Sequence, residues 1–324
     1  MPCRKRSVRS PIEKRTAKIR RKDSTGADAD DNWSHEDEFE DSYNDEEYQP
    51  ASSQDDTERD GSSAPEKELG EEDYYPRTTI IPYEKLRPLD GIEYSSTRVH
   101  RNTLLYLIDL RANNNRDWFK GHEKEFRRAR KDWASFVETL TPKIIAFDAT
   151  VPELPPSDIV FRIYRDIRFS KDQRPYKSHF SAAFSRTGRR RPYACYYIHL
   201  DPGSSYVGGG LWAPEPPTIQ LLRQSIDERS EEWRQVLSSE PFRSIFLPTT
   251  QNGAEAAVRA FADANQEGAL KTKPKGRNYH VSKPVDDEIF TAEDGQERIV
   301  DLISTLEPFV TFLNAIIMSD QDGF

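Results

Sequence analysis

The 324-residue sequence has only two cysteines, Cys3 and Cys195, and no apolar run of about 18 residues that would form a transmembrane helix. A stabilising disulfide is therefore not expected, and a reducing compartment fits the composition. No cysteine or histidine pair has the spacing of zinc ligands, so we expect no metal and no cofactor. Because no apolar stretch follows the basic N-terminus, we expect an intracellular protein without a membrane partner.

The charges are segregated along the first quarter of the chain. Residues 1–23 contain ten Lys or Arg and two carboxylates, a net charge of +8, whereas residues 24–75 contain twenty Asp or Glu and two basic residues, a net charge of −18. Such polar sequence cannot bury enough apolar surface to offset the entropy of ordering a backbone. We therefore predict a disordered tail over residues 1–75, basic over 1–23 and acidic over 24–75.

The basic and the acidic part of this tail each allow more than one interpretation. The basic clusters at residues 4–6 and 20–22 are typical of a bipartite nuclear import signal, while a mitochondrial presequence or a plain solvated tail are the alternatives. Of these alternatives we prefer the first and the last, and we therefore expect a nuclear or cytoplasmic location. The isolated aromatic residues of the acidic tract could bind a protein partner. The alternative is that the tract is a solvated spacer that binds nothing.

Residues 76–324 have the hydrophobic periodicity of a single globular domain. Helices are expected at 103–110, stopped by Asn113–Asn115, and at 118–140, where Asp117 would cap the N-terminus. Further helices are expected from residue 219 to the C-terminus. Short strand-like segments occupy the middle of the domain at 159–164, 179–184, 193–200 and 205–207, and Gly208–Gly210 interrupts the last of them. This order predicts an α+β fold with a central antiparallel sheet packed by helices.

Positive charge in the domain is concentrated between residues 160 and 191, where ten Lys or Arg face two carboxylates. Guanidinium groups bind phosphate and carboxylate through paired hydrogen bonds. The candidate anion-binding residues are Arg162, Arg165, Arg168, Lys171, Arg174, Lys177 and, from the asparagine turn, Arg116. The candidate supporting residues are Asn114, Asn115, Asp117, Trp118, Asp166, Asp172 and Tyr176. The alternative is that Arg165 and Arg168 pair with Asp166 or Asp172 and only fix the loop.

These segments carry a family resemblance. The turn 114–119, the stretch 165–177 and the Tyr-rich and Gly-rich segment 196–214 resemble the family called domain of unknown function 2461 over about residues 98–276, extending to about 314. The resemblance implies a fold and domain boundaries but no activity. Residues 277–284 depart from the family pattern, which puts that loop in doubt.

Three functions from different classes remain open. The first is a binding module that recognises nucleic acid or a phosphorylated small molecule through the Arg/Lys-rich loop, and it is our preferred prediction. The second is an enzyme acting on a small anionic substrate, with Asp166, His122, His179 or His199 in proton transfer. The third is a protein-interaction module that acts through the charged tail. The glycine run lacks the Lys and Ser or Thr of a phosphate-binding loop.

Overall fold

The computed structural model describes residues 85–168, 172–247 and 278–318, together with residues 256, 258 and 261. The predicted disordered tail, the start of the domain at residue 76 and the candidate Lys171 lie outside the described residues. The candidate anion-binding residues other than Lys171 all lie within them.

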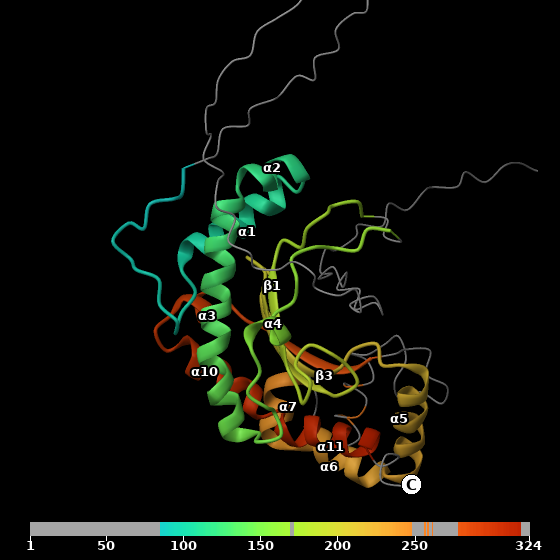
Figure 1. Ribbon diagram of the computed structural model, residues 1–324. Coiled ribbons are helices and arrows are strands. Elements are labelled where there is room, and N and C mark those ends of the chain that lie inside the picture. Colours follow the sequence, from blue (N-terminus) through green and yellow to red (C-terminus); the bar gives the residue numbers. More distant parts are fainter. Residues whose placement is uncertain are drawn as a thin grey trace, which may run out of the picture.

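Four antiparallel strands form one sheet in the order β1-β2-β3-β4, which confirms the predicted α+β class. The strands are β1 (Phe180–Phe184), β2 (Cys195–Leu200), β3 (Tyr206–Leu211) and β4 (Tyr279–Pro284). A tight turn at residues 201–204 joins β2 to β3, where Ser204 N donates to Asp201 O at 2.7 Å. Figure 1 shows the sheet at the centre of the domain.

Ten helices lie in the described ranges around this sheet. They are α1 (Arg101–Ala112), α2 (Arg116–Gly121), α3 (Glu123–Phe147), α4 (Pro156–Ile159), α5 (Pro216–Glu228), α6 (Ser230–Ser238), α7 (Glu240–Phe246), α9 (Glu288–Thr291), α10 (Gly295–Ser304) and α11 (Glu307–Met318). Within these residues no single helix is both long and apolar enough to cross a membrane, although α10 and α11, which meet at a bend of 51°, together pass that test of length and composition.

One face of the sheet, here called the apolar face, forms the core with α3, α10 and α11. Its side chains alternate along each strand and include Phe180, Ile198 and Val207, each at most 2% exposed. Trp133 of α3 is fully buried and stacks on Phe180 with ring centroids 6.1 Å apart. Because burying a large apolar side chain contributes about 1.5–3 kcal/mol, this face supplies much of the stability.

The opposite side of the same strands, here called the polar face, carries different residues. Strand pairing places His199 beside Tyr206 and Ser181, and Gly210 beside His280. Polar and aromatic side chains therefore line one face of the sheet while the other packs the core.

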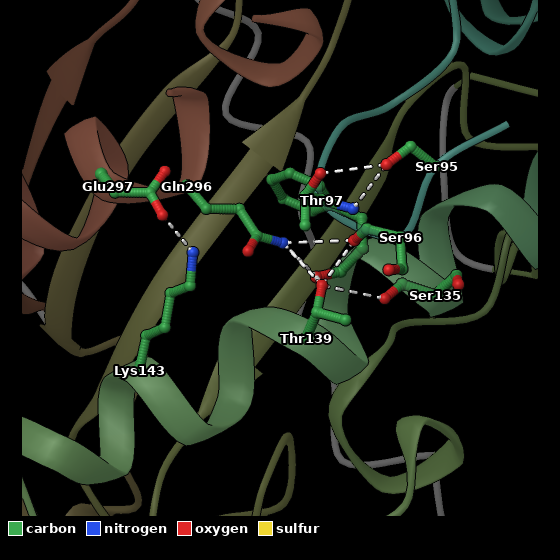
Figure 2. A network of polar contacts seen from close by, with 9 residues as sticks. Ser95, Ser96, Thr97, Ser135, Thr139, Lys143, Gln296 and Glu297 are labelled. Atoms are coloured by element: carbon green, nitrogen blue, oxygen red, sulfur yellow. Dashed lines mark hydrogen bonds and ion pairs between the residues drawn. The ribbon is translucent and has the colours of Figure 1, made fainter. Parts of the chain in front are cut away.

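A buried polar network connects the loop at Ser96, which precedes α1, to α3 and α10 (Figure 2). The fully buried Gln296 donates to the Thr139 hydroxyl at 2.8 Å, and Thr139 donates to the carbonyl oxygen of Ser96. At the rim of the network, Lys143 pairs with Glu297 at 2.5 Å. These contacts fix the orientation of α10 against α3.

Two predictions around the first helices are corrected in part. The helix α1 ends at Ala112 before the asparagine run, as predicted, but the predicted helix 118–140 is divided at His122 into α2 and α3. The side chain that caps α2 is Asn115, whose Oδ1 accepts from Trp118 N at 2.9 Å. Asp117 instead lies in the first turn, where it opposes the helix dipole.

The strand predictions also need correction. The predicted strand 159–164 is wrong, because Pro156 starts the short α4 and only Val160 and Tyr164 make isolated bridges. The glycine run does not interrupt a strand but lies inside β3. A Cβ on Gly208 would lie 2.3 Å from Val281 O, so the close approach of β4 requires glycine. The segment 277–284, which we expected to depart from the family pattern, contains β4, a strand that the sequence did not reveal.

Candidate functional site

The Arg/Lys-rich loop forms a hairpin at one end of the sheet. Residues 163–177, here called the basic hairpin, pair through Arg165 N to Pro175 O at 3.0 Å and Lys177 N to Ile163 O at 2.7 Å. Tyr164 and Tyr176 form a β-bridge between its two arms. Figure 1 shows the arms, coloured yellow-green, extending away from the sheet. The loop is therefore ordered near its base by its own backbone.

The asparagine turn and α2 anchor this hairpin. Asn114 donates through Nδ2 to Tyr176 O at 2.8 Å and accepts from Tyr176 N at 3.1 Å. The Tyr176 ring stacks on Phe119 with centroids 3.9 Å apart. Trp118 instead stacks on His122 at 3.8 Å. The structure thus brings Asn114 to the hairpin, whereas Asn115, Asp117 and Trp118 organise α2.

Two carboxylates hold three of the hairpin guanidinium groups. Asp172 Oδ2 lies 2.5 Å from Nη1 of Arg165 and 2.6 Å from Nη2 of Arg174. Asp166 accepts three side-chain hydrogen bonds from Arg168, at 3.0, 3.3 and 2.9 Å. Hydrogen bonds from Arg174 and Arg165 hold the pKa of Asp172 well below its usual range. The ion pairs expected if Arg165 and Arg168 only fix the loop are therefore present.

These pairs leave the outer guanidinium groups accessible. The side chains of Arg168 and Arg174 are 59% and 47% exposed, whereas that of Arg165 is 12% exposed. Because Asp172 is shared by two arginines, this group of three charges has a net positive charge. Arg165 is thus the structural member of the set, and Arg168 and Arg174 are the members that reach solvent.

The remaining candidates lie at the base of the hairpin. The Lys177 ammonium lies 5.5 Å from the ring centroid of Phe161, within cation–π range. Burial raises the pKa of the Tyr176 hydroxyl, and the charge of Arg116 opposes this shift. Anion binding by these residues stays a prediction.

A second polar cluster lies beside the hairpin base, on the polar face. His179 and His199 have ring centroids 4.2 Å apart, and with Asp201 they offer one ligand atom each, all within 4.8 Å of one another. The sequence singled out His179 and His199 separately as acid–base candidates. Only the pairing of β1 with β2 shows that they meet, and the turn residue Asp201 was missed.

The surroundings of this cluster orient its members. Tyr197 Oη lies 3.2 Å from Nδ1 of His199, and the Tyr206 ring stacks on His199 at 4.4 Å. Arg111, at the end of α1, pairs with Oδ1 of Asp201. Burial raises the pKa of Asp201, and Arg111 opposes this shift. His199 and Asp201 are two positions apart, and this spacing was the one local signal that their side chains would share a face of the sheet.

The histidines outside this cluster have other surroundings. His122 lies at the break between α2 and α3, where its Nδ1 is 2.7 Å from Trp118 O. His280 lies on the polar face beside Trp212, and burial lowers its pKa to about 4. Burial also raises the pKa of the Cys195 thiol to about 12, which makes it a poor nucleophile.

Two hollows in the described part of the chain lie away from the basic hairpin. One, of about 340 Å³, lies between the loop at Ile92, the start of α1 and Asp287. The other, of about 20 Å³, lies beside Cys195 and Trp212. None of the described hairpin residues lines either of these two hollows.

Comparison with protein-family models gives a match over residues 102–312 to a family described as conserved hypothetical protein (DUF2461). The matched range includes the basic hairpin, the histidine cluster and all four strands. Neither the curated proteins nor the solved structures give a match.

Proposed function

The chain belongs to the DUF2461 family of conserved hypothetical proteins, and we propose that its domain binds a phosphate-bearing ligand through the basic hairpin. The ligand is a nucleic acid or a phosphorylated small molecule, which share the phosphate group that guanidinium recognises. The observation that carries the proposal is the surplus of positive charge on the described arms of this hairpin.

The surplus follows from the ion pairs. Three arginines of the hairpin, Arg165, Arg168 and Arg174, pair with its two carboxylates, Asp166 and Asp172. Asp172 cannot neutralise both arginines that it contacts. Its bonds also hold Arg174 in a fixed orientation, so less side-chain entropy is lost when a phosphate binds. The carboxylates thereby position the guanidinium groups without cancelling their charge.

An exposed aromatic ring favours a nucleic acid over a free phosphate ester. The side chain of Tyr164 is 59% exposed at the hairpin base, next to Arg165. Aromatic rings on a basic surface stack on unpaired bases, which contributes about 1–3 kcal/mol per base. A single-stranded segment would therefore use both the charge and the ring.

A second candidate function is catalysis on a small anionic substrate. It is favoured by one observation: the side chains of His179, His199 and Asp201 lie close together. Of these, His179 is only two residues from Lys177 in the sequence. Imidazole and carboxylate groups that lie close together can transfer protons near neutral pH. The solvent exposure of the Arg168 and Arg174 side chains favours binding over this alternative.

The proposals that concern the tail are a nuclear location through residues 1–23 and a protein partner for residues 24–75. A fluorescent fusion of residues 1–30 tests the first, and cytosolic fluorescence would contradict it. Deleting residues 1–75 tests the second, since a partner that binds the tail is then lost while the domain keeps its oligonucleotide affinity.

The binding proposal is tested with the double variant Arg168→Gln, Arg174→Gln and a fluorescein-labelled single-stranded oligonucleotide followed by anisotropy. Affinity should fall at least about tenfold, since a hydrogen bond to a charged group contributes about 1.5–3 kcal/mol. Competition with pyrophosphate separates the ligand classes. Full displacement at low concentration indicates a phosphate site, and weak displacement indicates a polynucleotide site.

A matched control removes the same charge elsewhere. Arg127 and Arg234 also form ion pairs on helix surfaces, with side chains 75% and 34% exposed. The variant Arg127→Gln, Arg234→Gln should bind as the wild type does. Equal losses in both double variants would show that only net charge matters, and that outcome contradicts a hairpin site.

A further inference from the structure

Strand pairing brings three metal-ligating side chains to one edge of the polar face. In the β1–β2 register Phe180 lies opposite Leu200, so His179 lies one position further along, opposite Asp201. His199 precedes Asp201 by two residues and therefore shares its face. Residues about twenty positions apart in the sequence thus meet through the sheet.

We propose that His179, His199 and Asp201 bind a divalent first-row transition metal ion such as Zn²⁺ or Fe²⁺. Their ligand atoms all lie within 4.8 Å of one another. Metal–ligand bonds to imidazole and carboxylate are about 2.0–2.2 Å long, so a small rotation of the side chains lets all three reach one ion. This inference does not depend on the basic hairpin and goes beyond the proposed anion binding.

The donor set indicates the class of metal. Two imidazoles and one carboxylate are the ligands of catalytic zinc centres and of non-haem iron(II) centres. Mg²⁺ and Ca²⁺ prefer oxygen ligands alone. Three protein ligands leave a coordination position for water or a substrate, which is typical of a reactive rather than a structural site.

The neighbouring residues suit such a site. Tyr197 contacts Nδ1 of His199 at 3.2 Å, and Tyr206 stacks on the same ring, so the imidazole is oriented from two sides. Arg111 contacts Oδ1 of Asp201, and a carboxylate has a second oxygen for an ion. Arg111 is a competing cation, so the ion must bind tightly enough to share this carboxylate.

The expectation that no metal is bound came from the spacing of cysteines and histidines along the chain. Spacing detects ligands that lie on one short loop or helix, whereas these ligands lie on two strands. The register of β1 against β2 supplies the proximity that the spacing does not show.

The experiment uses the full-length protein after treatment with a chelator. Co²⁺ is titrated while its visible absorption is followed, and Zn²⁺ then displaces it. The wild type should bind one Co²⁺ saturably with the spectrum of a nitrogen–oxygen site. His179→Gln and Asp201→Asn should each weaken binding at least about 100-fold, beyond the range for residues outside the ligand shell, whereas Tyr197→Phe should cost about tenfold.

His122→Gln is the matched control, because it removes a histidine outside the cluster and should leave Co²⁺ affinity unchanged. The acidic tract of residues 24–75 is present in every variant, so any weak binding to it cancels in the comparison. Wild-type affinity in both ligand variants, or only weak unsaturable binding by the wild type, would overturn the proposal.

A measurement on the wild type alone guards against variants that fail to fold. Zn²⁺ should shift the imidazole NMR signals of two of the six histidines. Because the His179 and His199 ring centroids lie only 4.2 Å apart, these two signals should respond together. Signals that stay unchanged at saturating Zn²⁺ would overturn the site without any substitution.

Discussion

The two faces of the sheet use the same strands for different purposes. Along β2, Ile198 and Leu200 are fully buried on the apolar face, while His199 between them belongs to the polar cluster. The alternation of a strand lets one sequence serve both faces. Stability is therefore concentrated on the apolar face, whereas the candidate chemistry is concentrated on the polar face and the basic hairpin.

The largest expected effect lies on the apolar side. Trp133→Ala should lower the free energy of unfolding by about 3–5 kcal/mol, because it removes the largest fully buried ring under β1. Chemical denaturation measures the change. Trp133→Phe, which keeps an aromatic ring in place, should cost much less. An equal loss in both variants would contradict the packing explanation.

The next effect is a pH dependence from the polar face. Burial lowers the pKa of His280 to about 4 from its ordinary value of 6.5. The unfolded chain therefore takes up a proton at higher pH than the folded protein. This contribution to stability is present above pH 6.5 and is lost as the pH falls toward 4, by about 3 kcal/mol in total.

His280→Asn tests this assignment. The wild type should lose stability relative to the variant between pH 6.5 and 4, and the difference between the two denaturation curves should be flat above that range. Taking the difference removes the contributions of buried carboxylates such as Asp132, whose pKa burial raises. A constant difference across the whole range would contradict a neutral His280 imidazole in the folded protein.

A smaller loss of stability is expected on removing the Tyr196 hydroxyl, a polar group on the apolar face. Tyr196 donates through its hydroxyl to Oδ2 of the buried Asp148 at 2.8 Å. Tyr196→Phe should cost about 1–3 kcal/mol, because it leaves a buried carboxylate oxygen without this donor. Thermal unfolding measures the loss. A neutral result would mean that Asp148 is satisfied by other groups.

The smallest effect on stability is expected at the hairpin anchor. Asn114→Ala removes two bonds to the Tyr176 backbone and should lower the free energy of unfolding by about 1 kcal/mol. Oligonucleotide affinity should fall as well, because the hairpin loses its position. Asn113→Ala, at the end of α1, provides the control and should leave affinity unchanged. A normal affinity in Asn114→Ala would separate the anchor from binding.

The sequence predicted the parts of the fold that depend on local periodicity. The alternating apolar residues of 179–184 and 193–200 correspond to β1 and β2, and the asparagine run ends α1. Local patterns did not reveal β4, since its pairing with glycines of β3 depends on residues about seventy positions away. The division at His122 also depends on contacts with Trp118 that periodicity does not contain.

The candidate site was predicted less completely. The cations of residues 160–191 are visible in the sequence, and so is the possibility that they pair with Asp166 and Asp172. Which arginine is buried and which reaches solvent depends on the hairpin fold. The meeting of His179 with Asp201 depends on strand register, which a single sequence does not specify.

The most direct test of the central claim, that the basic hairpin binds phosphate, is the salt dependence of oligonucleotide affinity in the wild type and in Arg168→Gln, Arg174→Gln. On a plot of log affinity against log salt concentration, each phosphate contact to a single strand contributes a slope of about −0.7. If the hairpin binds phosphate, the slope should be steep for the wild type and shallower by about 1.4 for the variant. Equal slopes in the two proteins, or an affinity that salt does not change, would contradict it.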